Sequence, residues 1–297
     1  MKPSLTIVIL TFNEEKNVPE LIGQLKDFSY PIFVVDSYST DATLDYLIDN
    51  KITYVQHEFI NYSKQRNWAQ ANNPFKTDWV LHLDADERLT PELIHWLNKV
   101  FPIVSDQFEG FMFGRRAIFM DRWIKSHYNY HLRLYKTAYG KCEEKAYDQH
   151  YILNGRSCLV KKADMTSKVC DNLNEFVAGH NKWAFLEAID IVNKRSSGEV
   201  KNKITGSPIE STRWLKNNVF QKTPLFLRSF AYFIYRYIFK LGFLEGKEGL
   251  IFHILQAFWF RFLVDAKVYE LKKGMSTKQC TLAELLRTEY NYTLPIQ

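Results

Sequence analysis

The sequence predicts an α/β fold in which a mainly parallel central sheet is followed by a helical, aromatic-rich and basic C-terminal region. Up to residue 101, short β-branched runs alternate with helical patterns, which is typical of a parallel sheet with crossover helices. After about residue 180 only helical periodicity remains. With 297 residues and 46% hydrophobic residues, the chain can bury a sizeable core. We therefore expect two parts, residues 1–180 and residues 181–297.

The expected elements follow from the runs of apolar residues in order. Strands are predicted over 5–10, 32–36, 52–55 and 78–84, with helices over 14–28, 41–49, 62–72 and 91–100. Extended segments are predicted between 109 and 135, and later helices over 181–196, 210–220, 224–243 and 247–272. In sheets of this kind ligands bind beyond the carboxyl ends of the strands. Each strand end is therefore a candidate site position.

Polar residues cluster at three of these strand ends, in the segments 11–15, 36–41 and 84–87. A lone Asp at a strand end is as often a cap or a turn residue, but three clusters together favour a site. Strand alternation places Asp84 and Asp86 on the same side. Their hard oxygen atoms suit Mg²⁺ or Mn²⁺, and a site with few protein carboxylates completes its shell with phosphate oxygens of a substrate.

Four motifs in these segments resemble the nucleotide-sugar-binding half of inverting family 2 glycosyltransferases, which have the GT-A fold. The motifs occupy residues 5–15, 34–41, 63–67 and 83–87, and the resemblance covers about the first 120 residues. Three later segments resemble the bacterial lipopolysaccharide-core β-1,4-glucosyltransferase subgroup more loosely; these are residues 115–124, 132–136 and 180–188.

The resemblance implies roles for particular residues. A nucleotide diphosphate sugar would be bound by six residues: Thr11, Asn13 and Glu14 at the base and ribose, Asp36 accepting a hydrogen bond from uracil, Arg66 near the nucleotide, and Asp84 near the ribose and metal. Asp86 would ligate the Mg²⁺ or Mn²⁺ that bridges the two phosphates. A cation there would stabilise the charge of the leaving diphosphate.

An inverting transfer also needs a general base that takes the proton of the acceptor hydroxyl. The acidic segment 142–150 matches the region where subgroup members carry a short acidic motif, often His-Glu, from which this sequence departs. We rank Asp148 first and Glu144 second as the base. The alternative is that the segment is a solvated acidic loop, because clustered charges usually lie on the surface.

The C-terminal third holds the basic excess, with 15 Lys and Arg against 7 Asp and Glu in residues 201–297. Its apolar helices carry Arg228, Arg236 and Lys240, a composition typical of helices that lie in the headgroup layer of a membrane. Packing against the rest of the protein is the alternative. Charged residues interrupt every long apolar run, so we expect no segment that spans a bilayer. With no nucleic-acid-binding module, we expect no nucleic-acid partner.

We therefore expect a hexosyltransferase that moves a sugar from a nucleotide diphosphate donor, UDP-linked, to a glycolipid or oligosaccharide hydroxyl in cell-envelope polysaccharide biosynthesis. The four cysteines form no C-x-x-C pair, which favours reduced thiols and a cytoplasmic enzyme. From the C-terminal helices we expect it to be peripheral at the cytoplasmic face of the inner membrane. A catalytically silent sugar-nucleotide-binding scaffold is one alternative, against which the Asp84/Asp86 pair argues. A nucleotidyltransferase is another, but Thr11–Glu15 stands where its Gly-rich basic loop would lie.

Overall fold

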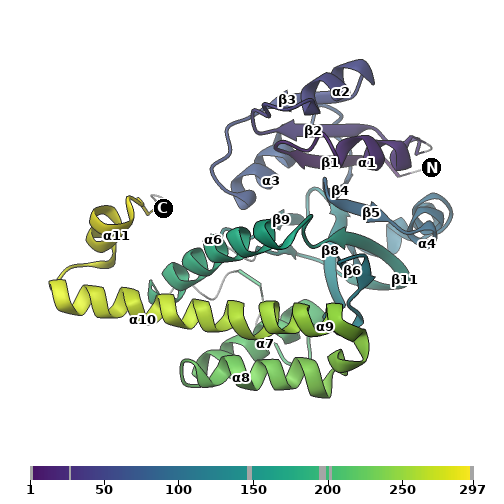
Figure 1. Cartoon of the computed structure of the whole chain (residues 1–297). Coiled ribbons are helices and arrows are strands. Elements are labelled where there is room, and N and C mark those ends of the chain that lie inside the picture. Colours follow the sequence, from purple (N-terminus) through teal and green to yellow (C-terminus); the bar gives the residue numbers. More distant parts are fainter. Residues whose placement is uncertain (1–2, 27, 146–148, 194–198, 201–202, 295–297) are drawn as a thin grey trace. The chain divides into compact units, whose positions relative to one another are not determined.

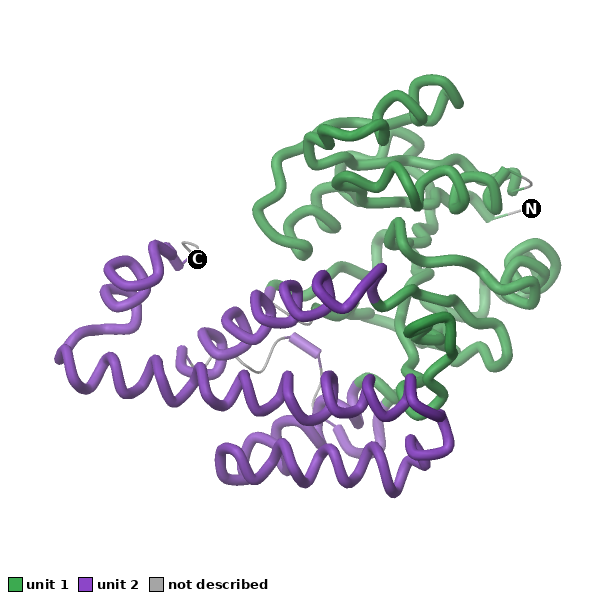
Figure 2. Tube along the Cα trace, viewed as in Figure 1, with its two compact units in different colours: residues 1–144, 148–169, 207–209 green, residues 145–147, 170–206, 210–297 purple. Residues whose placement is uncertain are grey.

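The computed structural model describes residues 3–26, 28–145, 149–193, 199–200 and 203–294, and these form two compact units (Figure 2). Unit 1 contains the described residues of 1–144, 148–169 and 207–209, and unit 2 those of 145–147, 170–206 and 210–297. The boundary expected at residue 180 falls inside helix α6 (Leu173–Val192). All of α6 belongs to unit 2.

The first half of the sheet in unit 1 is parallel, as expected from the alternation of strands and helices (Figure 1). Its strands are β1 (Leu5–Thr11), β2 (Ile32–Asp36), β3 (Thr53–Gln56) and β4 (Trp79–Asp84), in the order β3-β2-β1-β4. Thr11 lies opposite Asp36, and Leu10 lies opposite Asp84. The three polar clusters of the sequence therefore meet at one edge.

The second half of the sheet is mixed, in the order β4-β8-β6-β11-β5. Its strands are β5 (Glu87–Leu89), β6 (Gly110–Phe119), β7 (Arg122–Trp123), β8 (Asn129–Lys136) and β11 (Ser157–Lys168). Strand β8 runs antiparallel to both β4 and β6, and it lies directly beside the strand that ends at Asp84. A separate hairpin is formed by β9 (Gly140–Cys142) and β10 (Tyr151–Leu153).

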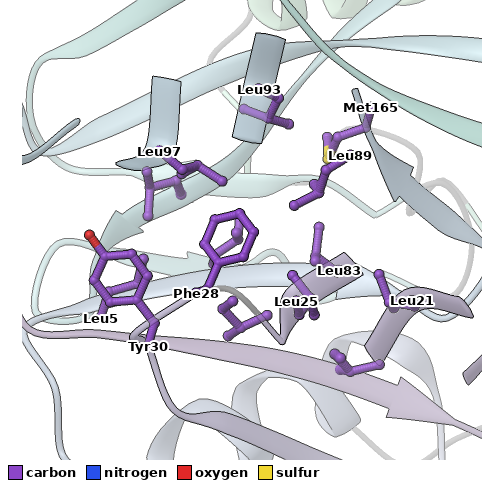
Figure 3. Close-up of a cluster of buried hydrophobic side chains, with 14 of the residues drawn as sticks. Leu5, Leu21, Leu25, Phe28, Tyr30, Leu83, Leu89, Leu93, Leu97 and Met165 are labelled. Atoms are coloured by element: carbon purple, nitrogen blue, oxygen red, sulfur yellow. The ribbon is translucent and has the colours of Figure 1, made fainter. Parts of the chain in front are cut away.

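Helices cover both faces of the sheet. The helical segments of unit 1 are α1 (Val18–Leu25), α2 (Thr43–Asp49), α3 (Tyr62–Ala71), α4 (Pro91–His95), the π-helical turn η1 (Trp96–Val100), α5 (Phe101–Val104), and the single turns η2 (Ser105–Gln107) and η3 (Lys125–His127). Residues of α1 and α4 share with β1 and β4 the buried cluster that Figure 3 shows, which includes Leu25, Leu93, Leu5 and Leu83. On α3, Ala69 packs with Val8 of β1 and Val80 of β4 in a second cluster.

Unit 2 is helical over its described residues. Its segments are α6, α7 (Pro208–Asn218) from residue 210 on, η4 (Phe220–Lys222), α8 (Leu227–Ile234), η5 (Tyr235–Phe239), η6 (Gly242–Glu245), α9 (Gly246–Phe252), η7 (His253–Trp259), α10 (Phe260–Lys278) and α11 (Leu282–Tyr290). Segments α9, η7 and α10 form one continuous helix. The core of unit 2 joins α6, α10 and α11 through residues such as Ala188, Val264 and Leu285.

Two of the three basic residues expected at a membrane surface are internal. Arg228 is buried and donates to Asp265 from Nε at 2.7 Å, and Arg236 is buried with Nη1 donating to Tyr232 at 3.0 Å. Lys240 alone of the three is exposed. The expectation was wrong for both arginines, because Arg228 pairs with the buried Asp265 and Arg236 is itself buried beside Tyr232.

One helical stretch of the described residues, Gly242–Lys278, is long and apolar enough to cross a membrane, judged on length and composition only. Its most apolar window has a mean hydropathy of 1.3, and 39% of that window is buried inside the protein. Core helices of soluble proteins meet the same criteria, so this helix is weak support for a membrane span.

Candidate functional site

Asp36 organises the end of β2. Its carboxylate accepts hydrogen bonds from Thr11 Oγ1 at 2.9 Å and from the backbone N–H of Ser39 at 2.8 Å, and it is completely buried. The side chains of Thr11 and Asp36 thus meet across the parallel pair β1 and β2. This arrangement gives Asp36 a structural task in the loop, and its contact with a uracil ring stays a prediction.

The loop after β1 is held against the loop after β2. Asn13 adopts a left-handed backbone conformation with φ of 57°, and its Oδ1 accepts from the backbone N–H of Thr40 at 2.8 Å. Glu14 donates its backbone N–H to Thr43 Oγ1 at 2.8 Å. Burial raises the pKa of the Glu14 carboxyl, and the nearby charges of Asp86 and Asp84 raise it further. Glu14 therefore lies close to the acidic residues at the end of β4.

Asp84, the last residue of β4, is clamped between two guanidinium groups. Arg66 on α3 donates from Nη2 to Oδ1 at 2.8 Å, and Arg133 on β8 donates from Nη2 to Oδ2 at 2.9 Å. Burial by itself would raise the pKa of Asp84. The charges of Arg133 and Arg66 outweigh this effect and hold the pKa well below its usual range. Asp84 is therefore ionised, and each of its oxygens is paired.

Glu87 shares Arg133 with Asp84. Its Oε1 lies 2.5 Å from Arg133 Nη2, and its Oε2 accepts from the backbone N–H of Asp84 at 3.0 Å. Burial raises the pKa of Glu87 to about 7, although the charge of Arg133 opposes the shift. Arg133 thus joins β8 to both ends of the turn between β4 and β5.

Asp86 has different surroundings because it lies in the turn after β4. The alternation of side chains along a strand, from which we predicted that Asp84 and Asp86 share a side, therefore does not apply to it. Its Oδ2 accepts from Ser167 Oγ on β11 at 2.8 Å. Burial raises the pKa of Asp86, and the charge of Asp84 raises it further. Unlike Asp84, Asp86 makes no ion pair among the described residues.

The residues fit a divalent cation that takes one protein carboxylate. No group of three or more His, Cys, Asp or Glu side chains gathers in a metal-binding arrangement within the described ranges. Because both oxygens of Asp84 are paired with arginines, Asp86 is the carboxylate that could reach a cation. Such an ion would complete its shell with phosphate oxygens and water, as Mg²⁺ commonly does.

The acidic segment after β9 is anchored on α3 beside Arg66. Asn67 pairs with the backbone of Cys142 through two hydrogen bonds of 2.8 and 2.9 Å, and Ser63 Oγ donates to the carbonyl of Glu143 at 2.7 Å. Glu143 is buried and accepts from the backbone N–H of His150 at 3.0 Å, which closes the base of the loop.

The two residues ranked as the general base belong to this loop. Glu144 is exposed. Asp148 lies outside the described residues, so the structure does not address its position. The two ends of the loop are nevertheless fixed, at Glu143 and at His150. The loop is followed by Tyr151, the first residue of β10, whose ring centre lies 5.5 Å from the guanidinium carbon of Arg66.

The floor of the site is rich in hydrogen-bond donors. Four buried polar atoms have no hydrogen-bond partner within the described part of the chain: Arg66 Nε, Arg133 Nε, His131 Nε2 and Tyr151 Oη. Burial keeps the pKa of His131 well below its usual value, helped by the charges of Arg115 and Arg133. The Arg66, Arg133 and Tyr151 groups beside Asp84 therefore offer hydrogen-bond donors of the kind that phosphate oxygens accept.

Four residues of this arrangement were not predicted from the sequence as site residues: Arg133, Glu87, Tyr151 and Ser167. Arg133 stands in the segment 132–136 that carried the looser resemblance, and Glu87 directly follows Asp86. Their contacts depend on β8 and β11 joining the sheet, which spacing along the chain does not reveal. Of the predicted residues, the structure brings Glu14, Arg66, Asp84 and Asp86 together, and it places Thr11 and Asp36 side by side at the ends of β1 and β2.

Comparison with known proteins decides the family. The profile described as Glycosyl transferase family 2 matches residues 6–161, more than half of the chain. The chain belongs to glycosyl transferase family 2. As a family 2 glycosyltransferase it combines a GT-A-like α/β domain with a helical C-terminal region, which confirms the predicted fold class and the prediction of a sugar-transferring enzyme.

Two relatives of this glycosyltransferase are themselves named glycosyltransferases, and one solved structure aligns over most of the chain. It is 25% identical over 301 residues to an uncharacterized glycosyltransferase of Rickettsia bellii, covering 98% of this chain and 94% of the relative. The glycosyltransferase SunS of Bacillus subtilis is 33% identical over 95 residues, which are 30% of this chain and 22% of SunS. The crystal structure of S. aureus TarS 1-349 aligns with a TM-score of 0.43 at 15% identity, covering 93% of this chain and 92% of that one.

Proposed function

We propose that this glycosyltransferase moves a hexose from a nucleotide diphosphate sugar, UDP-linked, to an acceptor hydroxyl with inversion of the anomeric centre. The observation that carries the proposal is the convergence of Glu14, Arg66, Asp84 and Asp86 at one edge of the parallel sheet. Ligands of open α/β sheets bind at that edge. The three loops that meet there come from the carboxyl ends of β1, β2 and β4.

In the proposed complex the diphosphate lies beside Asp86 and the arginine clamp on Asp84. A bound Mg²⁺ or Mn²⁺ would neutralise phosphate charge as the diphosphate leaves. Asp86 would hold that cation. Arg66, with its guanidinium already fixed against Asp84, offers a preorganised positive charge that costs little reorganisation during the reaction.

The loop between Glu143 and His150 supplies the proposed general base. Inversion requires a base on the face of the sugar opposite the diphosphate, where it takes the proton of the acceptor hydroxyl. We keep the ranking of Asp148 before Glu144. The anchoring of the loop on α3 supports this assignment, because it fixes both ends of the loop near Arg66 and Tyr151.

The acceptor and the location of the enzyme are also proposals. We propose a glycolipid or oligosaccharide acceptor in cell-envelope polysaccharide biosynthesis, as in the lipopolysaccharide-core β-1,4-glucosyltransferase subgroup, and a peripheral position at the cytoplasmic face of the inner membrane. The basic excess of residues 201–297 supports this location, because the cytoplasmic leaflet is anionic.

The test measures donor binding and donor turnover separately. UDP-glucose, UDP-galactose and UDP-N-acetylglucosamine are titrated with and without Mn²⁺ while the thermal unfolding temperature and UDP release are followed. We expect one donor to raise the unfolding temperature, since a ligand that binds only the folded state stabilises it. The same donor should release UDP slowly by hydrolysis in the presence of the ion.

Asp86→Asn is the decisive variant, and Asp45→Asn, at an exposed position on α2, is its matched control. Asp86→Asn should keep the fold and lose the Mn²⁺-dependent part of donor binding and turnover, whereas Asp45→Asn should behave as the unaltered protein. Equal activity of the two variants would contradict the assignment of Asp86. Binding of a donor without any turnover, even with a panel of acceptors, would instead favour the silent scaffold.

A further inference from the structure

We propose that the helical hairpin formed by α8–η5 and α9–η7 inserts its apolar face into an anionic lipid bilayer. The inference deepens the peripheral location given under the proposed function, and it rests on exposed apolar side chains rather than on the basic helix surface that the sequence suggested. It concerns unit 2 alone and is independent of how unit 1 binds its donor.

The first observation is a stripe of exposed apolar residues on α8–η5. Leu227, Phe230, Ile234 and Ile238 are all exposed, and their spacings of three, four and four residues place them on one side of the helix. The opposite side faces the protein, where Arg228 and Ser229 are buried. Soluble proteins rarely expose a continuous apolar surface of this kind without a partner. We call these four residues the α8 stripe.

The second observation is the hairpin turn that continues the stripe. Phe239, Leu241, Phe243 and Leu244 are exposed there, with fractional exposures as high as 73% at Phe239 and 64% at Leu244. We call these four residues the turn residues. Exposure is therefore greatest at the end of the hairpin, where α8–η5 gives way to the helix that starts at Gly246 (Figure 1).

Packing and backbone conformation fix the turn in a form that leaves these side chains exposed. Leu241 adopts the left-handed conformation with φ of 59°, and a Cβ on Gly242 would lie 2.5 Å from Nε2 of His253, so the chain passes close to the buried imidazole. The ring centres of Phe230 and Phe258 are 4.6 Å apart, which ties α8 to η7. The apolar side chains therefore remain presented to the surroundings without a large ordering cost on binding.

Charge indicates what covers this face. Three lysines, Lys222, Lys240 and Lys247, are exposed on the hairpin and its approach. The acidic residues between positions 219 and 260, a range that the structure describes in full, are Glu245, which is buried, and Glu248, which is partly exposed. Exposed apolar residues together with exposed lysines on the same hairpin and its approach match an anionic membrane.

The packing of α10 favours insertion at the surface over a membrane span. Phe260, Val264 and Val268 are buried in the core that α10 shares with α6. Asp265 pairs with Arg228, and Arg261 Nη1 donates to Glu187 at 3.0 Å. The α10 part of the apolar helix therefore packs inside unit 2. The part that can contact lipid is the hairpin end, at α9 and the turn before it. A second copy of the chain is the competing occupant, but the greatest exposure lies at the turn instead of along the stripe.

The test is co-sedimentation with vesicles of phosphatidylcholine alone and of phosphatidylcholine mixed with phosphatidylglycerol, at low and high salt. We expect the unaltered protein to pellet with the mixed vesicles and to stay bound at high salt, because insertion is not screened. The double variant Phe239→Ser/Leu244→Ser should partition at least about tenfold more weakly. Ile103→Ser, at a position 74% exposed in unit 1, is the matched control and should bind unchanged.

Several outcomes would overturn the proposal. These are absence of pelleting with both vesicles, equal pelleting of the double variant and the unaltered protein, and complete release by salt, which would indicate purely electrostatic contact. A further outcome, in light scattering, is that the unaltered protein is a dimer and the double variant a monomer. Together with an absence of vesicle binding, this result would assign the face to a second copy of the chain. If the double variant does not fold, Ile234→Ser replaces it at the α8 stripe.

Failure of this proposal can be told apart from failure of the proposed function. The variant should retain Mn²⁺-dependent release of UDP from the donor, because the turn residues lie outside the site in unit 1. Vesicle binding without donor turnover would reject the proposed function and keep the insertion surface. Donor turnover without vesicle binding would reject the insertion surface alone.

Discussion

Arg133 Nη2 donates to Asp84 Oδ2 at 2.9 Å across the antiparallel pair β8 and β4, and the same guanidinium meets Glu87. Arg133 is almost completely buried. It therefore pairs with two carboxylates at once, the buried Glu87 and the partly exposed Asp84, and it holds Asp84 in a fixed orientation beside Arg66. Arg133 acts as a positioning residue for the end of β4.

Replacing Arg133 should be costly for stability. Arg133→Met would leave Asp84 and Glu87 without their shared cation, and breaking a buried ion pair from one side costs about 3–5 kcal/mol. Lys278→Met removes the exposed pair with Glu289, which is worth at most about 1 kcal/mol. Urea unfolding of both variants gives the comparison. Similar losses in the two would contradict the role of Arg133.

The anchor between α3 and the acidic loop gives a second prediction. Asn67→Ala would remove both hydrogen bonds to the Cys142 backbone and leave its N–H and carbonyl without partners, at about 1–3 kcal/mol. Limited proteolysis should then cut the segment 142–150 faster. Asn72→Ala is the control, because Asn72 is exposed and, within the described residues, its side chain bonds only to Trp68 in the last turns of α3. Equal cleavage of the two variants would argue against the anchor.

The general base can be identified by paired isosteric changes. Asp148→Asn, which cannot accept the proton, should lower the maximal transfer rate about 10²–10⁴-fold and leave the Michaelis constant for the donor unchanged. Glu144→Gln should have a smaller effect, and steady-state kinetics with a fixed acceptor gives both numbers. A large loss in Glu144→Gln alone would reverse the ranking, and normal rates in both would place the base outside this loop.

His82 provides a prediction for pH. Burial keeps the pKa of His82 well below its usual value, and the charges of Arg66 and Arg133 lower it further. The unfolded chain then binds more protons than the folded protein as the pH falls below about 6.5, so His82 destabilises the fold in acid. Relative to His82→Phe, the unaltered protein should lose stability between pH 7.5 and 5.5, as measured by urea unfolding.

The control for this prediction is His95→Phe, at an exposed position on α4. Other ionisable groups also titrate in this range, and the pKa of Glu87, raised by burial to about 7, acts in the opposite sense. The comparison therefore uses differences between variants instead of the whole pH profile. A constant gap between the unaltered protein and His82→Phe across the range would show that His82 is not the cause.

The sequence alone predicted much of unit 1, because local patterns report local structure. Strands β1, β2, β3 and β4 lie within one or two residues of their expected positions, since each is a short β-branched run bounded by turn residues. The parallel order follows from the alternation with helices, and it brings the clusters at Thr11, Asp36 and Asp84 to one edge. The meeting of these clusters at one edge could therefore be predicted from the sequence, and their contact with a donor stays a prediction.

Only the tertiary structure could decide which side chains meet. Arg133 follows Asp84 by 49 residues and reaches it because β8 inserts beside β4, a pairing that no local pattern encodes. Tertiary contacts also decided which basic residues of the C-terminal helices are exposed, and here the expectation from composition was wrong. Composition suggested that Arg228 faces lipid, but the approach of α8 to α10 buries it against Asp265 and leaves Phe239 and Leu244 exposed instead. Burial and charge pairing depend on contacts between distant segments, and the sequence determines these only through the fold.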